Sequence, residues 1–254
     1  MAQRFRNYIV NRRKNVLNEK YALWEDKYRS RRIVEDLHVQ LPGLIAVADT
    51  VDRIDFTALT DKYVIKPNHW AASEGVFCMC DGINLITGHR TDICSIKQKI
   101  RTLLRKTFTY EKSQSLIERK VIVEELLRNE DGLFRPLTDY KMFVFGGETR
   151  FIQVIQDRDI GYSCIFMTPE WKPSPRRMTV FKYPRKPPPR PIHLEAMMKD
   201  AETLQKAFGE FLRVDMYATD RGAVFGEFTH APASGEHFTD YGNTVLGELF
   251  NQFG

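Results

Sequence analysis

The chain of 254 residues lacks the long apolar segments and cysteine patterns that define several large classes of protein. No apolar stretch approaches the roughly 20 residues needed to span a bilayer. The basic N-terminus, MAQRFRNYIVNRRKNV, has no apolar stretch of the kind that a secretory signal needs, so we expect a cytoplasmic protein without a membrane span. The four cysteines form no CxxC pair, and we expect reduced thiols.

Common signatures of nucleotide and nucleic-acid binding are also missing. Neither GxGxxG nor GxxxxGK[ST] occurs, which argues against a Rossmann or P-loop nucleotide site. The six histidines form no HxH or HExxH spacing. The net charge of +5, from 38 basic and 33 acidic residues, is too mild to indicate nucleic acid as a partner.

The composition that remains is that of a globular chain, with 43% hydrophobic and 28% charged residues. Apolar periodicity predicts helices over 1–38, 95–108 and 193–208, and strands over 44–48, 63–66, 76–80 and 121–127. We expect strand 44–48 to be buried. Two hairpins follow, over 139–157 and 211–230. Because strands and helices alternate at first and antiparallel hairpins then dominate, we predict an α+β or mixed α/β fold, not a doubly wound sheet.

A proline-rich basic segment covers residues 172–190, KPSPRRMTVFKYPRKPPPR. It holds seven basic side chains, six prolines and no acidic residue. The prolines exclude a continuous helix or a central strand. Two interpretations stay open, a solvated loop or a mobile flap over an anionic substrate, with Arg176 and Arg177 as the substrate contacts.

The last predicted hairpin brings charged residues together. A three-residue turn over 220–222, with a glycine at its end, pairs residue 219 with residue 223. Partner numbers then sum to 442, which places Asp215 opposite Glu227 and Arg213 opposite Thr229. All four side chains share one face, because side chains alternate along a strand. The other face is a core face, made of Leu212, Val214, Met216 and Phe228.

Two carboxylates directly opposite each other repel, and a divalent cation between them turns that repulsion into binding. Oxygen ligands with room for water and phosphate suit Mg²⁺. A guanidinium beside the metal suits a transferring phosphoryl group. The alternative is a solvent-exposed polar face on an edge hairpin, and a register slip of one residue would remove the metal site.

Lys66 ends the strand YVIK and precedes the loop 67–75, which contains His69 and Ser73. Such a loop could hold phosphates with backbone N–H groups while the lysine pairs a phosphate oxygen. The alternative is a solvated edge lysine.

Two later strands carry further candidates. Glu124 and Glu125 are adjacent on a strand and face opposite ways, so only one can enter a given cleft, where it could bind a ribose. Asp139 and Lys141 share a face in the next strand, and Lys141 is a second candidate phosphate lysine.

The ordered set of motifs resembles the ATP-grasp superfamily and, more narrowly, the TupA-like ATP-grasp family, named for teichuronopeptide biosynthesis. The resemblance rests on DKYRSRRIVED, YVIKPNH, VIVEELL, DYKMFVFGGETRFIQV, LRVDMY, GEFT and the ASG of 233–235. It implies an ATP-grasp fold of two α+β subdomains with ATP between them. The implied divisions are a reduced helical N-terminal region (1–60), a small subdomain (61–125) and a large subdomain (126–254) that includes 172–190.

The resemblance also implies ATP and Mg²⁺ as cofactors and a role for each matching position. The phosphates are held by Lys66 and Lys141, with His69 and Ser73 from the loop. The adenine and ribose are contacted by the hinge residues Glu124, Glu125, Leu126 and Leu127, and by Asp139. The metal is bound by Asp215, Glu227 and Thr229, beside Arg213, which stabilises the transferring phosphoryl group together with Lys141. The acceptor lies near Ser234 and Gly235.

The implied reaction is ATP-dependent ligation of a carboxylate to an amine through an acyl phosphate, on a sugar acid or amino acid of a cell-surface polysaccharide or related conjugate. A kinase-like phosphotransferase and a non-catalytic module that binds nucleotide or polyanion remain as alternatives. The chain departs from the family's H-G-S-G loop at Trp70, and has Thr229 where many ATP-grasp enzymes have asparagine. The roughly 60 residues before Tyr63 are too few for a full N-terminal domain. The acceptor site is then incomplete, or completed by a second subunit or a partner enzyme.

Overall fold

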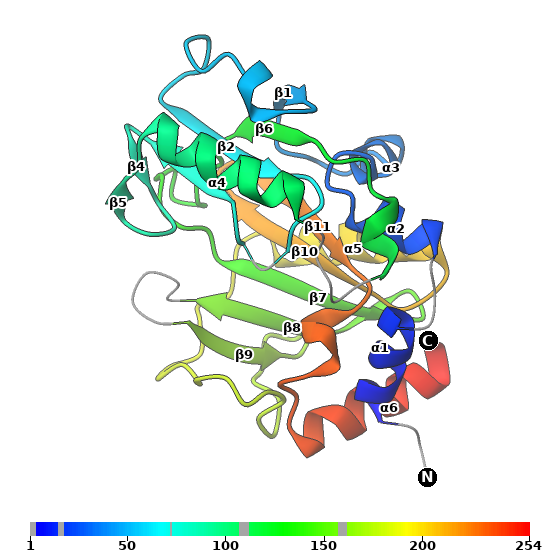
Figure 1. Ribbon diagram of the computed structural model, residues 1–254. Coiled ribbons are helices and arrows are strands. Elements are labelled where there is room, and N and C mark those ends of the chain that lie inside the picture. The colour runs from blue at the N-terminus through cyan, green and yellow to red at the C-terminus, as the bar shows by residue number, and fades with distance from the viewer. Residues whose placement is uncertain (1–3, 15–17, 72, 107–111, 157–161) are drawn as a thin grey trace.

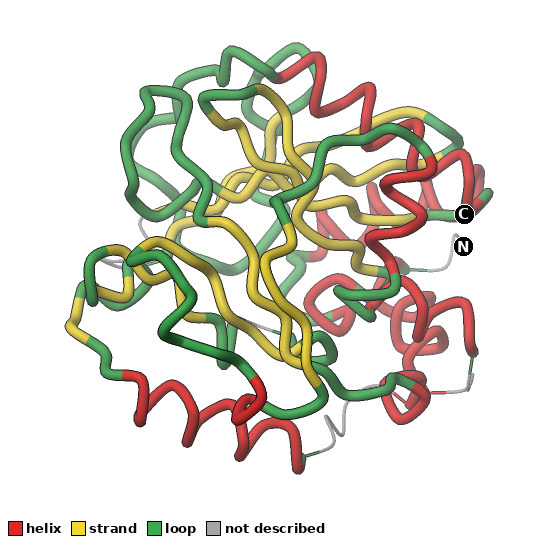
Figure 2. Tube along the Cα trace, turned by 90° about the horizontal axis from the view of Figure 1, so that it is seen from above, coloured by secondary structure: helices red, strands yellow, loops and turns green. Residues whose placement is uncertain are grey.

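In the computed structural model, the residues described (4–14, 18–71, 73–106, 112–156 and 162–254) form two antiparallel sheets with helices against them (Figure 1). The strand order is β1-β6-β2-β3-β4-β5 in the first sheet and β11-β10-β7-β8-β9 in the second. Seen from above, the two groups of strands lie next to each other with helices at the periphery (Figure 2). The predicted mixed α/β fold is confirmed.

The first sheet is covered on one face by a single amphipathic helix. The elements are β1 Leu44–Ala48, β2 Lys62–Pro67, β3 Phe77–Cys80, β4 Ile83–Asn84, β5 His89–Arg90, β6 Val121–Glu125 and α4 Ile93–Arg105, with short 3-10 turns η1 Val51–Arg53 and η2 Lys112–Leu116. Helix α4 begins at Asp92, whose side chain accepts from the backbone N–H of Ser95 at 2.7 Å. Its apolar stripe packs on the β2 and β6 side chains.

The prediction that strand 44–48 (β1) is buried is wrong. It lies at the edge of the first sheet, where it pairs only with β6. Ala46 and Ala48 pack toward α4, whereas Ile45 is 48% exposed. The apolar run LIAVA therefore marks a strand correctly but says nothing of its position in the sheet.

The second sheet is buried on both faces. Its strands are β7 Asp139–Phe145, β8 Glu148–Gln156, β9 Ser163–Met167, β10 Leu212–Thr219 and β11 Gly222–Thr229. One face packs against α5 Leu194–Phe208 and α2 Glu19–Glu25. The other packs against α1 Phe5–Lys14 and α6 Asp240–Phe253, near the short η3 Pro232–Gly235. Strand β9 and helix α6 were not expected from the sequence.

The β10–β11 hairpin reaches the predicted pairing by a different route. Its loop has two residues rather than three, because Thr219 pairs with Gly222. A bulge then leaves Gly226 unpaired and shifts the register by one. A Cβ on Gly226 would lie 2.9 Å from the Tyr217 ring, so the bulge needs glycine there. Beyond it, Asp215 pairs with Glu227, as predicted, while the predicted turn is wrong.

The N-terminal region is helical, as expected, but it breaks at the motif DKYRS. Helix α2 ends at Glu25 and α3 runs over Ser30–Asp36. Between them Asp26 Oδ1 accepts from the backbone N–H groups of Tyr28 (2.9 Å) and Arg29 (3.1 Å), which holds the turn that leads into α3. None of the helices in the described part of the chain has the length and apolarity required to cross a bilayer.

Candidate functional site

Strands β7, β10 and β11 place a set of charged side chains in one row on the second sheet. Asp215 of β10 stands opposite Lys141 of β7 on one side and Glu227 of β11 on the other. Arg213 forms a two-pronged contact with Asp215, from Nε to Oδ1 at 2.7 Å and from Nη2 to Oδ2 at 2.9 Å. Lys141 Nζ donates to the same carboxylate. The common face predicted for Arg213, Asp215, Glu227 and Thr229 is confirmed, and Lys141 joins it.

Arg213 links the two ends of this row. Its Nη2 donates to Thr229 Oγ1 at 2.7 Å and lies 3.8 Å from Glu227 Oε1. Burial lowers the pKa of Arg213, but the charges of Asp215, Glu227 and Asp139 outweigh it and raise that pKa overall. The guanidinium therefore stays charged while it is 91% removed from solvent, as a group that stabilises a phosphoryl oxygen must.

Glu227 is held by a lysine from the N-terminal region. Lys27 Nζ lies 3.2 Å from Glu227 Oε2. Burial raises the pKa of Glu227, but Lys27, Lys141 and Arg213 more than offset this and lower it to about 2. Glu227 is thus ionised at neutral pH, the form in which a carboxylate binds a metal ion.

Lys66 belongs to a second ionic cluster, on the first sheet. Its Nζ lies 2.6 Å from Glu124 Oε2, and Arg31 of α3 lies 2.6 Å from Oε1 of the same carboxylate. All three side chains are largely buried. Glu125 points elsewhere and accepts from Gly43 N at 2.5 Å and from Arg221. The expected opposite facing of the two glutamates is confirmed.

The loop 67–75 is built around two buried polar residues. Asn68 is fully buried, and its side chain forms hydrogen bonds with Asp26, the Glu118 carbonyl and the Lys120 backbone N–H. His69 is 2% exposed and packs at the end of α4, and burial together with the charge of Arg119 lowers its pKa. Ser73 is exposed, with φ +59°. Phosphate binding by His69 and Ser73 stays a prediction. Because the His69 ring is buried, only the backbone N–H of His69 could bind a phosphate.

The residues predicted to form the hinge and to lie near the acceptor belong to two separate turns of the chain. Leu126 and Leu127 directly follow β6, and Leu127 is buried. Ser234 and Gly235 form a left-handed turn, with φ +55° and +77°, and Ala233 before them has φ +47°. Non-glycine residues seldom adopt this conformation, and they cluster at functional sites. Arg13 of α1 donates to the Ser234 carbonyl at 2.9 Å, which ties α1 to this turn.

The basic segment 172–190 is anchored rather than free along its length. Cys164 N of β9 donates to the Lys182 carbonyl at 2.8 Å, and Val180 N to the His237 carbonyl at 2.9 Å. Met178 and Thr179 are buried. All seven basic side chains are exposed, so the segment presents a fixed cationic edge beside β9.

Three residues of this region were not singled out from the sequence: Lys27, Arg31 and Asn68. The first two lie in DKYRSRR, a motif whose charges were interpreted only as those of a helix. Asn68 was placed in the loop but given no role. Their functions depend on contacts between segments far apart in the chain, such as Lys27 with Glu227, which local patterns do not encode.

The donor set fits Mg²⁺. No three His, Cys, Asp or Glu side chains gather into a metal cage within the residues that the structure describes. Two carboxylates, Asp215 and Glu227, with the Thr229 hydroxyl close by, are what Mg²⁺ takes from a protein when phosphate and water supply the other ligands.

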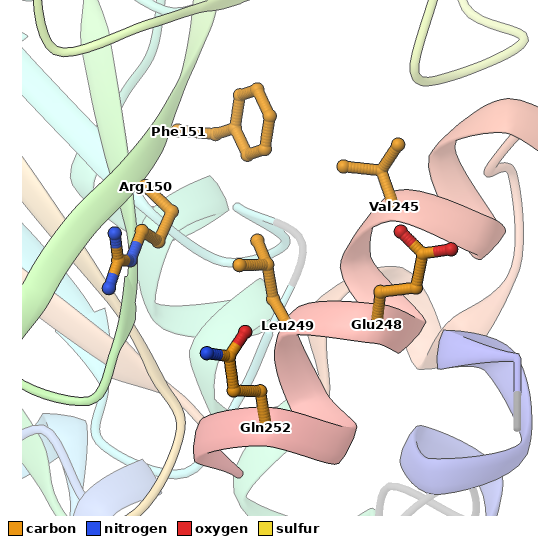
Figure 3. A pocket seen from close by; sticks show the side chains of 6 residues that line it. All are labelled: Arg150, Phe151, Val245, Glu248, Leu249 and Gln252. Atoms are coloured by element: carbon orange, nitrogen blue, oxygen red, sulfur yellow. The ribbon is translucent and has the colours of Figure 1, made fainter. Parts of the chain in front are cut away.

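A separate hollow of about 330 Å³ lies between β8 and α6 (Figure 3). It is lined by Arg150, Phe151, Val245, Glu248, Leu249 and Gln252. Phe151, Val245 and Leu249 give it an apolar floor, and no pair of carboxylates faces it. None of its residues belongs to the ionic rows above, so we do not place the nucleotide there.

Comparison with solved structures shows that this arrangement is the ATP-grasp fold. The D-alanine–D-alanine ligase of Bacillus anthracis is 16% identical, with a TM-score of 0.51 over 91% of this chain and 66% of that one. The corresponding Helicobacter pylori ligase is 14% identical, with a TM-score of 0.49 over 91% of this chain and 61% of that one. The ATP-grasp ligase PsnB, in complex with a minimal precursor, is 11% identical, with a TM-score of 0.48 over 92% of this chain and 61% of that one. The chain thus spans about three fifths to two thirds of the length of these ligases.

The sequence matches the TupA-like ATP-grasp family over residues 7–251, and the chain belongs to that family. A comparison with curated proteins gave no match.

Proposed function

We propose that the protein is an ATP- and Mg²⁺-dependent ligase that joins a carboxylate to an amine. The observation that supports this most is the row Lys141–Asp215–Glu227, with the Arg213 fork beside it, on the inner side of an ATP-grasp fold. Ionised carboxylates for a metal and fixed cations for phosphate stand next to each other, which is the combination that phosphoryl transfer needs.

In the proposed reaction a substrate carboxylate oxygen attacks the γ-phosphorus of ATP and displaces ADP. The acyl phosphate then reacts with an amine, which expels inorganic phosphate and releases a proton as the amide forms. Lys66 and Lys141 hold phosphate oxygens, and Arg213 offsets the charge that develops on the transferring group. Bound Mg²⁺, on Asp215 and Glu227, would neutralise the β- and γ-phosphates. Most of the rate gain comes from positioning and charge.

The exposed cationic edge 172–190 supports an anionic acceptor. Arg176 and Arg177 lie on it, and Thr239 Oγ1 donates to the Arg177 carbonyl at 2.7 Å, just beyond the 233–235 turn. We therefore propose that the acceptor binds near Ser234 and is a sugar acid or an acidic amino acid on a polysaccharide or related conjugate. We place this reaction in the cytoplasm, where ATP is available.

The test is ADP release against a panel of sugar acids and amines, with and without Mg²⁺. We expect release to require Mg²⁺, a carboxylate and an amine together, with formation of an amide. Release that needs only a hydroxyl acceptor, and yields a phosphate ester, would instead establish a phosphotransferase. Salt-dependent binding of a polyanion with no ATP turnover would show a non-catalytic module.

A further inference from the structure

Lys27 contacts two parts of the molecule that surround the proposed nucleotide site. It lies in the turn between α2 and α3, and its side chain is 13% exposed. Its Nζ lies 3.2 Å from Glu227 of the second sheet and donates to the Trp70 carbonyl at 2.8 Å. Its backbone N–H donates to the Asn68 carbonyl at 3.1 Å. Lys27 therefore touches the metal-binding row and the loop 67–75 at once.

We propose that Lys27 binds the terminal phosphate of the nucleotide. This inference rests on the proposed function, because it takes Glu227 as a metal ligand and the loop 67–75 as a phosphate loop. A Mg²⁺ ion on Glu227 shares that carboxylate's charge and repels an ammonium 3.2 Å away. The anions that would take the place of Glu227 are the phosphate oxygens, which a flexible ammonium can pair as a point charge.

The charges around the site are consistent with this role. Lys27, Lys66, Lys141, Arg31 and Arg213 bring positive charge to the site, where they pair with the carboxylates of Asp215, Glu124 and Glu227. A triphosphate with its Mg²⁺ is a net dianion, so each cation that turns from a carboxylate to phosphate strengthens nucleotide binding.

Lys27 also supports the irregular loop through its backbone. At Trp70 the loop has a bulky residue, and its carbonyl is fixed by Lys27. The Trp70 indole Nε1 donates to Glu74 at 2.9 Å, so the ring is bonded within the loop itself. The loop is therefore held in place from the N-terminal region, through the bonds of Lys27 to the Trp70 and Asn68 carbonyls.

The test measures nucleotide binding by calorimetry in Mg²⁺ for the full chain carrying Lys27→Met. The probes are a non-hydrolysable ATP analogue, ADP and AMP. We expect affinity for the ATP analogue to fall at least about 10-fold, because a charge-assisted hydrogen bond is lost. Affinity for ADP should fall less than for the analogue, and AMP binding should be unchanged. Lys27→Arg should recover most of the loss.

The matched control is Lys20→Met. Lys20 comes from the same N-terminal region and pairs with one glutamate, Glu210, at 2.6 Å, away from the site. The Lys20→Met protein should bind all three nucleotides with the affinities of the unmodified protein. An equal loss for all three nucleotides in Lys27→Met would overturn the proposal and leave Lys27 as a support of the loop, and unchanged affinities would overturn it too. If the unmodified protein binds no Mg²⁺–ATP, it is the proposed function that fails.

Discussion

Replacing Arg213 with lysine should lower the turnover of ATP by about 10²- to 10³-fold and leave ATP affinity within about 3-fold of that of the unmodified protein. Lysine keeps the positive charge that Asp215 needs, so the buried carboxylate stays compensated. It loses the planar fork that spans both Asp215 oxygens and reaches Thr229. If the guanidinium acts on the transferring phosphoryl group, its loss appears in kcat rather than in binding.

Arg12 provides the matched control for this substitution. Its side chain is as buried as that of Arg213, but it pairs with Glu210 at 2.7 Å and with the Phe211 carbonyl at 2.9 Å, just before β10, rather than with Asp215. Arg12→Lys should keep the turnover number while losing some stability. An Arg213→Lys protein with normal turnover would remove Arg213 from the reacting centre.

Replacing Asn68 with alanine should lower the free energy of unfolding by about 3 kcal/mol. The side chain donates to Asp26 at 2.8 Å and to the Glu118 carbonyl at 2.9 Å, and accepts from Lys120 N at 2.8 Å. Those partners are left short of a hydrogen bond in a place where Asn68 itself is fully buried. Chemical denaturation should show a lower midpoint with an unchanged slope.

The control for Asn68 is Asn129→Ala. The Asn129 amide also donates two hydrogen bonds, to the carbonyls of Leu133 (3.4 Å) and Arg135 (3.1 Å), but Asn129 is partly exposed. Water replaces those bonds, so the loss should be under about 1 kcal/mol. A loss of the same small size for Asn68→Ala would show that the α2–α3 turn does not depend on this residue.

The parts of the fold with strong periodicity could be predicted from the sequence. Helices α4 and α5 and the two large hairpins repeat their apolar residues at regular spacing, and local sequence fixes them. Strand β9 could not be predicted in this way, since SCIFM is a short buried run with no alternation. The exposure of β1 was missed because position in a sheet is set by partners elsewhere in the chain.

The row of Arg213, Asp215 and Glu227 was predictable because alternation on a hairpin places them together. The predicted pairing of Asp215 with Glu227 is confirmed, although the predicted three-residue turn is wrong. A two-residue loop and the Gly226 bulge shift the pairing by compensating amounts, so a simple count along the two strands happened to agree with the structure near Asp215. A bulge leaves little trace in local sequence beyond an isolated strand glycine.

The contributions of Lys27, Arg31 and Asn68 could not be predicted from spacing. Each joins the N-terminal region to a strand or loop far along the chain, 43 positions away for Lys27 with Trp70 and 93 for Arg31 with Glu124. Such pairs are set by how the N-terminal region packs against the rest of the molecule. The same holds for Lys141, whose partnership with Asp215 comes from the pairing of β7 with β10 across 74 positions.

The most direct test of the metal–nucleotide site is the Mg²⁺ dependence of ATP binding by Glu227→Gln, with Glu210→Gln as the control. Glu210 is likewise partly exposed and paired with two cations, Arg12 and Lys20. Calorimetry should show that Mg²⁺ strengthens ATP binding by the unmodified protein and by Glu210→Gln. For Glu227→Gln, affinity should fall at least about 10-fold and respond little to Mg²⁺. Unchanged affinity and unchanged Mg²⁺ dependence in Glu227→Gln would contradict the placement of the metal on this hairpin.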